Sequence, residues 1–188
     1  PVVARRLLGL SEPDPVHAAA VSPLVGRRWE MAAVEGLLQR AIEGHGAVVT
    51  VVGSPGIGKS RLVREVAGLA AAQGIEVSAA HCESHTTQVP FHTVARLLRA
   101  ATDIEHLDPK QARMRLRELD PEADPDDVLH FEDLVGVADP EAELPKIDPD
   151  ARRRRLTALV NTFSLTRESP AVYVIEDAHW IDEVSESM

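Results

Sequence analysis

The sequence predicts an α/β fold built on a mainly parallel sheet. Three apolar runs rich in β-branched residues have the length of buried strands and occupy residues 47–52, 75–79 and 171–175. Between these runs, apolar residues recur at three- and four-residue spacing, which is typical of helices. Strands that alternate with helices form sheets covered on both faces, so we expect a three-layer α/β sandwich.

The chain reaches the first strand through a helix. Residues 1–22 show little periodicity, and we interpret them as a linker from an upstream domain. A short apolar turn at 23–27 follows. The next segment has the apolar spacing of a helix at Val34, Leu37, Leu38, Ala41 and Ile42. Gly44-His45-Gly46 ends this helix and leads into the run at 47–52.

A glycine-rich loop follows the first apolar run directly. Residues 53–60 form a complete G-x-x-x-x-G-K-[ST] motif between a predicted strand and a predicted helix. Glycines let backbone N–H groups surround phosphate oxygens, and the helix N-terminus adds partial positive charge. Lys59 would pair with the β- and γ-phosphates, and the Ser60 hydroxyl would hold Mg²⁺. The predicted ATP-binding set is Gly53, Ser54, Pro55, Gly56, Ile57, Gly58, Lys59, Ser60 and Arg61.

Strands and helices continue to alternate after the loop. Gln73-Gly74 ends the loop helix, and the run at 75–79 is the second strand. Residues 90–92 open a helix whose apolar positions are Val94, Leu97 and Leu98. Further along, Asp148 can cap a long helix that begins at Pro149.

The segment 102–150 carries the negative charge of the chain. It holds 16 acidic and 5 basic side chains, a net of −11, against −10 for the whole sequence. We predict helices around 110–119 and 126–135, each broken by Asp-Pro dipeptides, and interpret the segment as a solvated helical insertion. An acidic docking surface is the alternative. Charge of this sign argues against direct nucleic-acid binding.

Composition favours a cytoplasmic location. No uncharged apolar run approaches the roughly 20 residues of a membrane span, and the N-terminal stretch lacks the apolar core of a signal peptide. Cys82 is the one cysteine, which excludes an internal disulfide and fits a reducing compartment.

The third apolar run ends in two carboxylates, Glu176 and Asp177, and has the form of a Walker B strand. A parallel strand brings such a pair beside the phosphate loop, where one carboxylate can hold Mg²⁺ and the other can orient the attacking water. The usual order is Asp then Glu. By register, Glu176 takes the metal position and Asp177 the water position, and the exchanged assignment stays open. The predicted metal set is therefore Ser60, Glu176 and Asp177, with Lys59, Glu176 and Asp177 as the catalytic set.

Three elements together resemble the STAND class of signalling ATPases within the AAA-type P-loop ATPases: Leu24-Val25-Gly26-Arg27, the loop at 53–60 and the segment 175–182. The resemblance implies a P-loop NTPase fold, with Val25, Gly26 and Arg27 at the adenine end of the site. It also implies that His179-Trp180 packs under the sheet. By this resemblance, residues 23–188 are the N-terminal part of a P-loop ATPase domain, which stops after the Walker B strand.

ATPases of this class act as switches, because their ATP and ADP states favour different domain arrangements. Residues 1–9 resemble the exit from a class III adenylyl cyclase domain, which favours a cyclase as the fused partner domain. A LuxR-type DNA-binding regulator is the alternative, and a protein effector is a further expected partner. A nucleotide-occupied interaction scaffold without turnover is the competing function.

Two polar clusters have alternative interpretations. Residues 81–85 (His-Cys-Glu-Ser-His) lack the spacing of a zinc site, so we interpret them as a strand-end turn. The turn follows a strand, and this could place His81 or Glu83 near the γ-phosphate. The arginine run 152–155 is expected to pair with the acidic segment, with an arginine finger as the alternative.

Overall fold

The computed structural model describes residues 24–165, 167 and 169–187. The linker predicted for residues 1–22 lies outside this part of the chain. In chain order the elements are α1 (Arg28–Ile42), α2 (Lys59–Ala72), β1 (Glu76–His81), α3 (His92–Ala101), α4 (Pro109–Leu119), α5 (Pro125–Leu134), α6 (Pro149–Leu165), β2 (Ala171–Glu176), the 3₁₀ turn η1 (Ala178–Trp180) and α7 (Glu183–Glu186).

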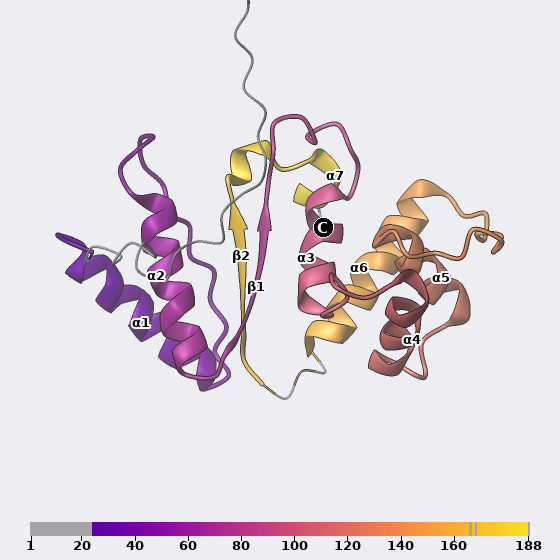
Figure 1. Ribbon diagram of the computed structural model, residues 1–188, viewed down its shortest axis with the longest axis horizontal. Coiled ribbons are helices and arrows are strands. Elements are labelled where there is room, and N and C mark those ends of the chain that lie inside the picture. Colours follow the sequence, from indigo (N-terminus) through magenta and orange to yellow (C-terminus); the bar gives the residue numbers. More distant parts are fainter. Residues whose placement is uncertain (1–23, 166, 168, 188) are drawn as a thin grey trace, which may run out of the picture.

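The two strands pair in parallel, which confirms the predicted α/β class. Their register runs from Glu76 opposite Ala171 to His81 opposite Glu176, so their carboxyl ends lie together. At the other end, the Arg167 guanidinium contacts the Glu76 carboxylate at 2.6 Å. Figure 1 shows α1 and α2 on one side of the strand pair and α3 with the remaining helices on the other.

The predicted first strand does not form. Residues 45–54 have neither helix nor strand, and Val48 and Val52 are 95% and 86% exposed. A strand requires a neighbour for its backbone N–H and C=O groups. Within the described residues, β1 and β2 pair with each other alone. The prediction of a buried strand at 47–52 was therefore wrong for this structure, because strand propensity depends on a partner to pack against.

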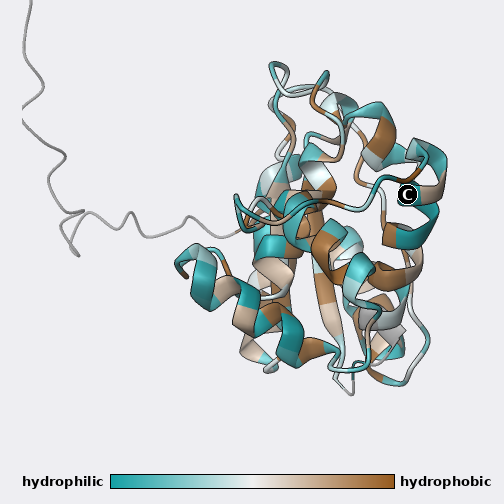
Figure 2. Ribbon diagram, turned by 90° about the vertical axis from the view of Figure 1, so that its right-hand side faces the viewer, coloured by the Kyte–Doolittle hydropathy of each residue, from teal (hydrophilic) through white to brown (hydrophobic). Residues whose placement is uncertain are grey.

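Most of the buried apolar side chains lie in a helical lobe formed by α4, α5 and α6 against the end of α3. The helices carry alternating apolar and polar bands, as amphipathic helices do (Figure 2). A smaller core lies between α1, α2 and β1 and consists of Leu38, Ala70 and Ile75. The buried residues of the lobe are Leu98, Ile104, Ala112, Leu116, Phe131, Leu134, Val135, Val137, Leu156 and Leu159.

Asp-Pro dipeptides begin α4, α5 and α6 rather than break them. Asp108 forms a capping box with Gln111 at the start of α4, and Asp124 accepts a hydrogen bond from the Asp126 N–H. The Asp148 carboxylate accepts from Asp150 N at 3.0 Å, and α6 begins at Pro149 as predicted. In each case aspartate satisfies a free N–H, and proline occupies a position that needs none.

Ion pairs tie α6 to α5. Arg152 contacts Asp133 at 2.6 Å, and Arg155 contacts Asp127 at 3.1 Å. These contacts confirm that the arginine run pairs with the acidic segment. In the part of the chain that the structure describes, no helix is both long and apolar enough to span a bilayer.

Candidate nucleotide-binding site

The glycines of the loop at 53–60 adopt conformations that other residues rarely do. Gly56 and Gly58 have φ of +79° and +94°, and Gly58 is the N-cap of α2. At Gly53, a Cβ would meet Ile57 Cγ2 at 3.0 Å. Backbone geometry therefore requires glycine at Gly56 and Gly58, since side chains are strained at such φ values, whereas a side chain at Gly53 would crowd Ile57.

Lys59 turns back over this loop. Its Nζ donates to the carbonyl oxygens of Gly53 at 3.0 Å and Ser54 at 3.3 Å. No side chain caps the N-terminus of α2, and its first turn has no acidic residue. The exposed Ser60 lies in that turn. The loop therefore presents an ammonium group, a hydroxyl group and uncapped helix N–H groups at one place, which suits an anionic ligand.

The element Val25-Gly26-Arg27 lies beside the loop. Arg27 Nη2 donates to the Ile57 carbonyl at 3.1 Å. Its Nη1 also pairs with Glu30 at 2.6 Å, and this hydrogen bond lowers the pKa of the Glu30 carboxyl. Val25 is 83% exposed. A surface pocket of about 270 Å³ adjoins this element, lined by Leu24, Arg27, Arg28, Met31, Ala32, Glu35 and Glu65.

Arg61, the last predicted loop residue, extends along α2. Its guanidinium contacts the Glu65 carboxylate at 2.6 Å, four residues later in the helix. Pairs at this spacing lie on one helix face. Arg61 therefore follows the helix surface in this structure.

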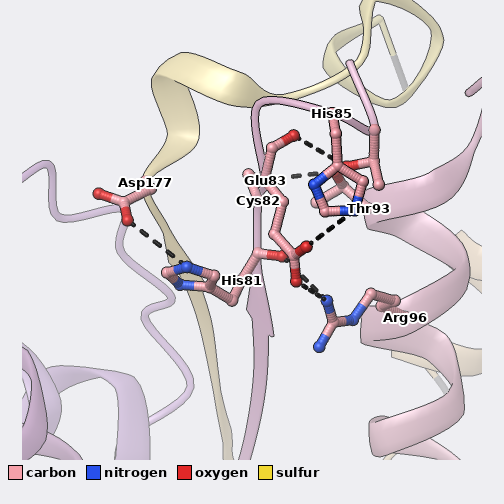
Figure 3. Close-up of polar contacts among 8 residues, drawn as sticks. His81, Cys82, Glu83, His85, Thr93, Arg96 and Asp177 are labelled. Atoms are coloured by element: carbon pink, nitrogen blue, oxygen red, sulfur yellow. Dashed lines mark hydrogen bonds and ion pairs between the residues drawn. The ribbon is translucent and has the colours of Figure 1, made fainter. Parts of the chain in front are cut away.

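The two predicted carboxylates follow one another at the carboxyl end of β2. Glu176 is the last residue of the strand and lies opposite His81 of β1. Asp177 has φ of +52° and occupies the N-cap position of η1, where its side chain makes no capping hydrogen bond. Its Oδ2 lies 3.6 Å from His81 Nε2 (Figure 3). The end of β1 therefore places His81 beside Asp177, and the expected position of His81 or Glu83 near the γ-phosphate stays a prediction.

The loop and the carboxylates lie at the same end of the molecule without touching. Figure 1 shows the loop before α2 and the carboxyl ends of both strands at the upper end of the view. Among the described residues, polar contacts hold the loop to Arg27 and to α2, and hold Asp177 to His81. None of them joins Lys59 or Ser60 to Glu176 or Asp177.

Sequence reasoning missed Asp182, a carboxylate that is 2% exposed. It accepts hydrogen bonds from the N–H groups of Phe91 at 2.9 Å, Thr93 at 3.1 Å and Ser185 at 2.9 Å. Burial alone would raise the pKa of Asp182, but these bonds outweigh burial and lower it. The sequence held one indirect signal for this role. α3 begins after Phe91, whose side chain cannot cap a helix, so another residue has to accept the free N–H groups.

The segment between Asp177 and Asp182 differs from the expectation for His179-Trp180. Trp180 is 42% exposed, and its ring lies 4.9 Å from that of His179. The indole therefore does not pack under the strand pair in this structure. Among the described residues, no group of three or more His, Cys, Asp or Glu side chains could hold a metal ion.

Comparison with known proteins gives one family and one relative. Residues 23–188 match the AAA ATPase domain family. The chain is 30% identical over 171 residues to the uncharacterized protein R02095 of Rhizobium meliloti (strain 1021), a match that covers 88% of this chain and 16% of that protein. No solved structure matches significantly. The family match extends over most of the chain and includes the loop and the carboxylates, so the chain belongs to the AAA ATPase domain family of P-loop NTPases, whose members typically bind ATP with Mg²⁺.

Proposed function

We propose that this chain is an ATP-binding, Mg²⁺-dependent regulatory module of a multidomain signalling protein, with slow ATP hydrolysis. The observation that carries the proposal is the loop at 53–60. Two of its glycines have positive φ, and Lys59 Nζ lies over its carbonyls at 3.0 and 3.3 Å. A phosphate group that enters the loop would exchange these carbonyl contacts for stronger charge-assisted ones.

ATP would bind with its phosphates on the loop and its adenine toward the element at 25–27. Loop N–H groups and Lys59 would contact the β- and γ-phosphates. Val25, Gly26 and Arg27 would form the adenine end, supported by the hydrogen bond from Arg27 to Ile57 in the loop itself. We assign Arg61 a supporting role at the end of the loop.

The oxygen groups of Ser60, Glu176 and Asp177 fit Mg²⁺, which prefers oxygen ligands and binds through one or two carboxylates together with phosphate oxygens. When bound, the ion neutralises charge that develops on the phosphates. Asp177 would orient the water that attacks the γ-phosphorus, while Lys59 and the loop N–H groups stabilise the transferred group. Asp reaches less far than Glu, so turnover would be slow.

The separation of the two motifs supports a second candidate function. No described polar contact joins the loop to Glu176 or Asp177, and the order of the two carboxylates is inverted. A nucleotide-occupied scaffold without turnover is consistent with both observations. Single-turnover hydrolysis by the natural full-length polypeptide separates the two functions. Release of phosphate supports the switch, whereas retained ATP without phosphate release supports the scaffold.

Substitution of Lys59 tests the proposal directly. Lys59→Ala removes the ammonium from the loop, and we expect ATP affinity measured by calorimetry to fall at least tenfold, since a charge-assisted contact contributes about 1.5–3 kcal/mol. Lys146→Ala is the matched control, because Lys146 is exposed and lies far along the sequence from the loop. Equal affinity in wild type and Lys59→Ala would contradict the assignment of the phosphate loop.

For the output of the switch, we propose an adenylyl cyclase domain that precedes residue 23 through the linker at 1–22, with a LuxR-type regulator as the alternative. The resemblance of residues 1–9 to a cyclase exit supports the first choice. In the Rhizobium meliloti relative, the matched part is 16% of a longer chain, which agrees with a module among other domains. The coding sequence on both sides of this segment, together with a cyclase assay, decides between the two.

A further inference from the structure

A short turn links the carboxylate edge of the strands to the buried Asp182. The 3₁₀ turn η1 leads from Asp177, which follows β2, to Asp182 at the start of α7. Within the turn, Trp180 N donates to the Asp177 carbonyl at 2.9 Å. Ile181 N donates to the Ala178 carbonyl at 3.1 Å. A displacement of Asp177 therefore moves Asp182 as well, because the connection between them is short and internally hydrogen-bonded.

Side chains of this segment accept the free N–H groups of α3. The Asp182 carboxylate binds the N–H groups of Phe91 at 2.9 Å and Thr93 at 3.1 Å. Ser185 Oγ accepts from Val94 N at 3.2 Å. Asp182 and Ser185 are both buried, and the N-cap residue of α3 makes no side-chain cap of its own. The first turn of α3 is therefore held by the segment that follows the carboxylates.

Phe91, at the start of this turn, has a strained backbone. Its φ is +63°, in the left-handed region that a bulky residue rarely occupies. Such a conformation persists only where the surrounding structure holds it. The hydrogen bond to Asp182 fixes the N–H of this residue. A weaker contact with Asp182 would therefore let the turn relax.

The same turn and α7 contact the helical lobe. The guanidinium of Arg152, in α6, lies 5.8 Å from the centre of the Phe91 ring. Arg152 also pairs with Asp133 of α5 at 2.6 Å. From the next position of α6, Arg153 Nη1 donates to Ser187 Oγ at 3.2 Å. Movement at the start of α3 therefore reaches α6 and, through the ion pair, α5.

The far end of α3 is fixed to the lobe as well. Arg99 Nη1 donates to the carbonyl of Val135, the C-cap of α5, at 2.6 Å. Leu98 lies in the buried core of the lobe. Figure 1 shows α3 between the strand pair and the lobe. α3 is thus attached to the carboxylate edge at one end and to the lobe at both.

We propose that the segment 177–187 is a latch through which nucleotide binding controls the helical lobe, with the first turn of α3 as its hinge. This inference rests on the proposed function, since the nucleotide acts on the latch through Glu176 and Asp177. ATP brings a γ-phosphate to these carboxylates and ADP does not, so the two nucleotides differ in their interaction with the latch. Contact with the γ-phosphate draws Asp177 and η1 toward the phosphate loop and loosens the hold of Asp182 on α3.

Hydrogen exchange of the natural full-length polypeptide, followed by mass spectrometry, tests this inference. The protein is compared with Mg²⁺ and a saturating non-hydrolysable ATP analogue, and with Mg²⁺ and saturating ADP. We expect amides in the first turn of α3 and in α5 to exchange about tenfold faster with the ATP analogue, a factor typical of coupled sites.

Two substitutions in the latch should remove this difference. Ser185→Ala deletes the acceptor for Val94 N and leaves the phosphate loop and the carboxylates intact. We expect fast exchange in α3 and α5 already with ADP, and a difference between the nucleotides of less than about twofold. Asp182→Asn should have the same effect more strongly, and Ser185→Ala carries the test if Asp182→Asn does not fold.

Asp124→Asn is the matched control. Asp124 also caps a helix, but it does so inside the lobe, where it accepts from Asp126 N at 2.8 Å. We expect faster exchange at the start of α5 with either nucleotide, and an unchanged tenfold difference between nucleotides in α3.

The outcomes separate this inference from the proposed function. Exchange in α3 that is equal or slower with the ATP analogue in the wild type would overturn the latch. An undiminished difference between nucleotides in Ser185→Ala would also overturn it. If calorimetry detects no ATP binding by the wild type, the proposed function itself fails.

Discussion

The phosphate-loop half and the carboxylate half of the site are built in different ways. In the loop half, the polar contacts of Lys59 stay within six residues along the chain, and the preceding run leaves Val48 and Val52 exposed. In the carboxylate half, Asp182 binds N–H groups 89 and 91 residues away along the chain, and β1 pairs with β2 across a similar separation.

This difference separates local from long-range determinants of the site. The loop depends on glycines at set positions, so its conformation follows from a few adjacent residues. The carboxylate half depends on a buried aspartate that supplies the missing cap of a distant helix. The phosphate loop can therefore be intact in the sequence, while the carboxylates that complete the site are positioned by residues outside any motif.

The largest effect is expected from the removal of the Asp182 carboxylate. Asp182→Ala leaves the N–H groups of Phe91, Thr93 and Ser185 without their acceptor in a buried position. We expect a loss of about 3 kcal/mol in the free energy of unfolding, measured by urea denaturation. Asp150→Ala is the control, because Asp150 is an exposed residue in the first turn of α6, and we expect a loss of less than about 1 kcal/mol. Similar losses in the two variants would contradict the role of Asp182 as the cap of α3.

Gly58→Ala, in the loop half, is expected to affect stability less than Asp182→Ala does and to affect ATP binding more. Gly58→Ala places a Cβ at φ of +94° and should cost about 1–2 kcal/mol in the free energy of unfolding. The same change distorts the loop, so calorimetry should show a loss of ATP affinity.

Gly36→Ala is the matched control for this substitution. Gly36 lies inside α1, has no positive φ, and has no atom within 4 Å of an added Cβ. We expect Gly36→Ala to stabilise the protein by about 0.5–1 kcal/mol. Destabilisation by both changes would show that the strain is not specific to the loop.

The same distinction between local and long-range contacts explains which features of the structure the sequence predicted. Most helices formed where apolar spacing placed them, and Asp148 caps α6 as expected, because these features depend on neighbours within a few residues. The strand expected at 47–52 failed because its formation depends on a pairing partner elsewhere in the chain. His81 and Glu83 were both candidates for a position near the γ-phosphate, and that stays a prediction. In the structure, His81 ends β1 and lies 3.6 Å from Asp177, whereas Glu83 follows the strand and pairs with Arg96.

The pH dependence of stability should distinguish Asp182 from a second buried titratable group, His130 of the lobe. Burial, followed by the nearby Arg152 charge, lowers the pKa of His130 from its ordinary 6.5. The folded protein therefore holds His130 neutral while the unfolded chain takes up a proton, so this stabilising contribution is lost as pH falls below about 6.5. In His130→Gln, we expect stability to vary less with pH between about 7 and 5 than in the wild type, as measured by urea denaturation.

The contribution of Asp182 should be lost at lower pH. Its pKa is lowered in the folded state from the ordinary 3.8, so its stabilising effect is complete above the pKa of the unfolded chain and disappears as pH falls through the folded value. Within the His130→Gln background, the difference in unfolding free energy between Asp182 and Asp182→Asn should be constant from about pH 7 to 5 and decrease below about pH 4. A difference that decreases already near pH 6 would mean that the Asp182 carboxylate is protonated more easily than its three N–H donors allow. The cap that Asp182 provides for α3 would then contribute less to stability than its hydrogen bonds indicate.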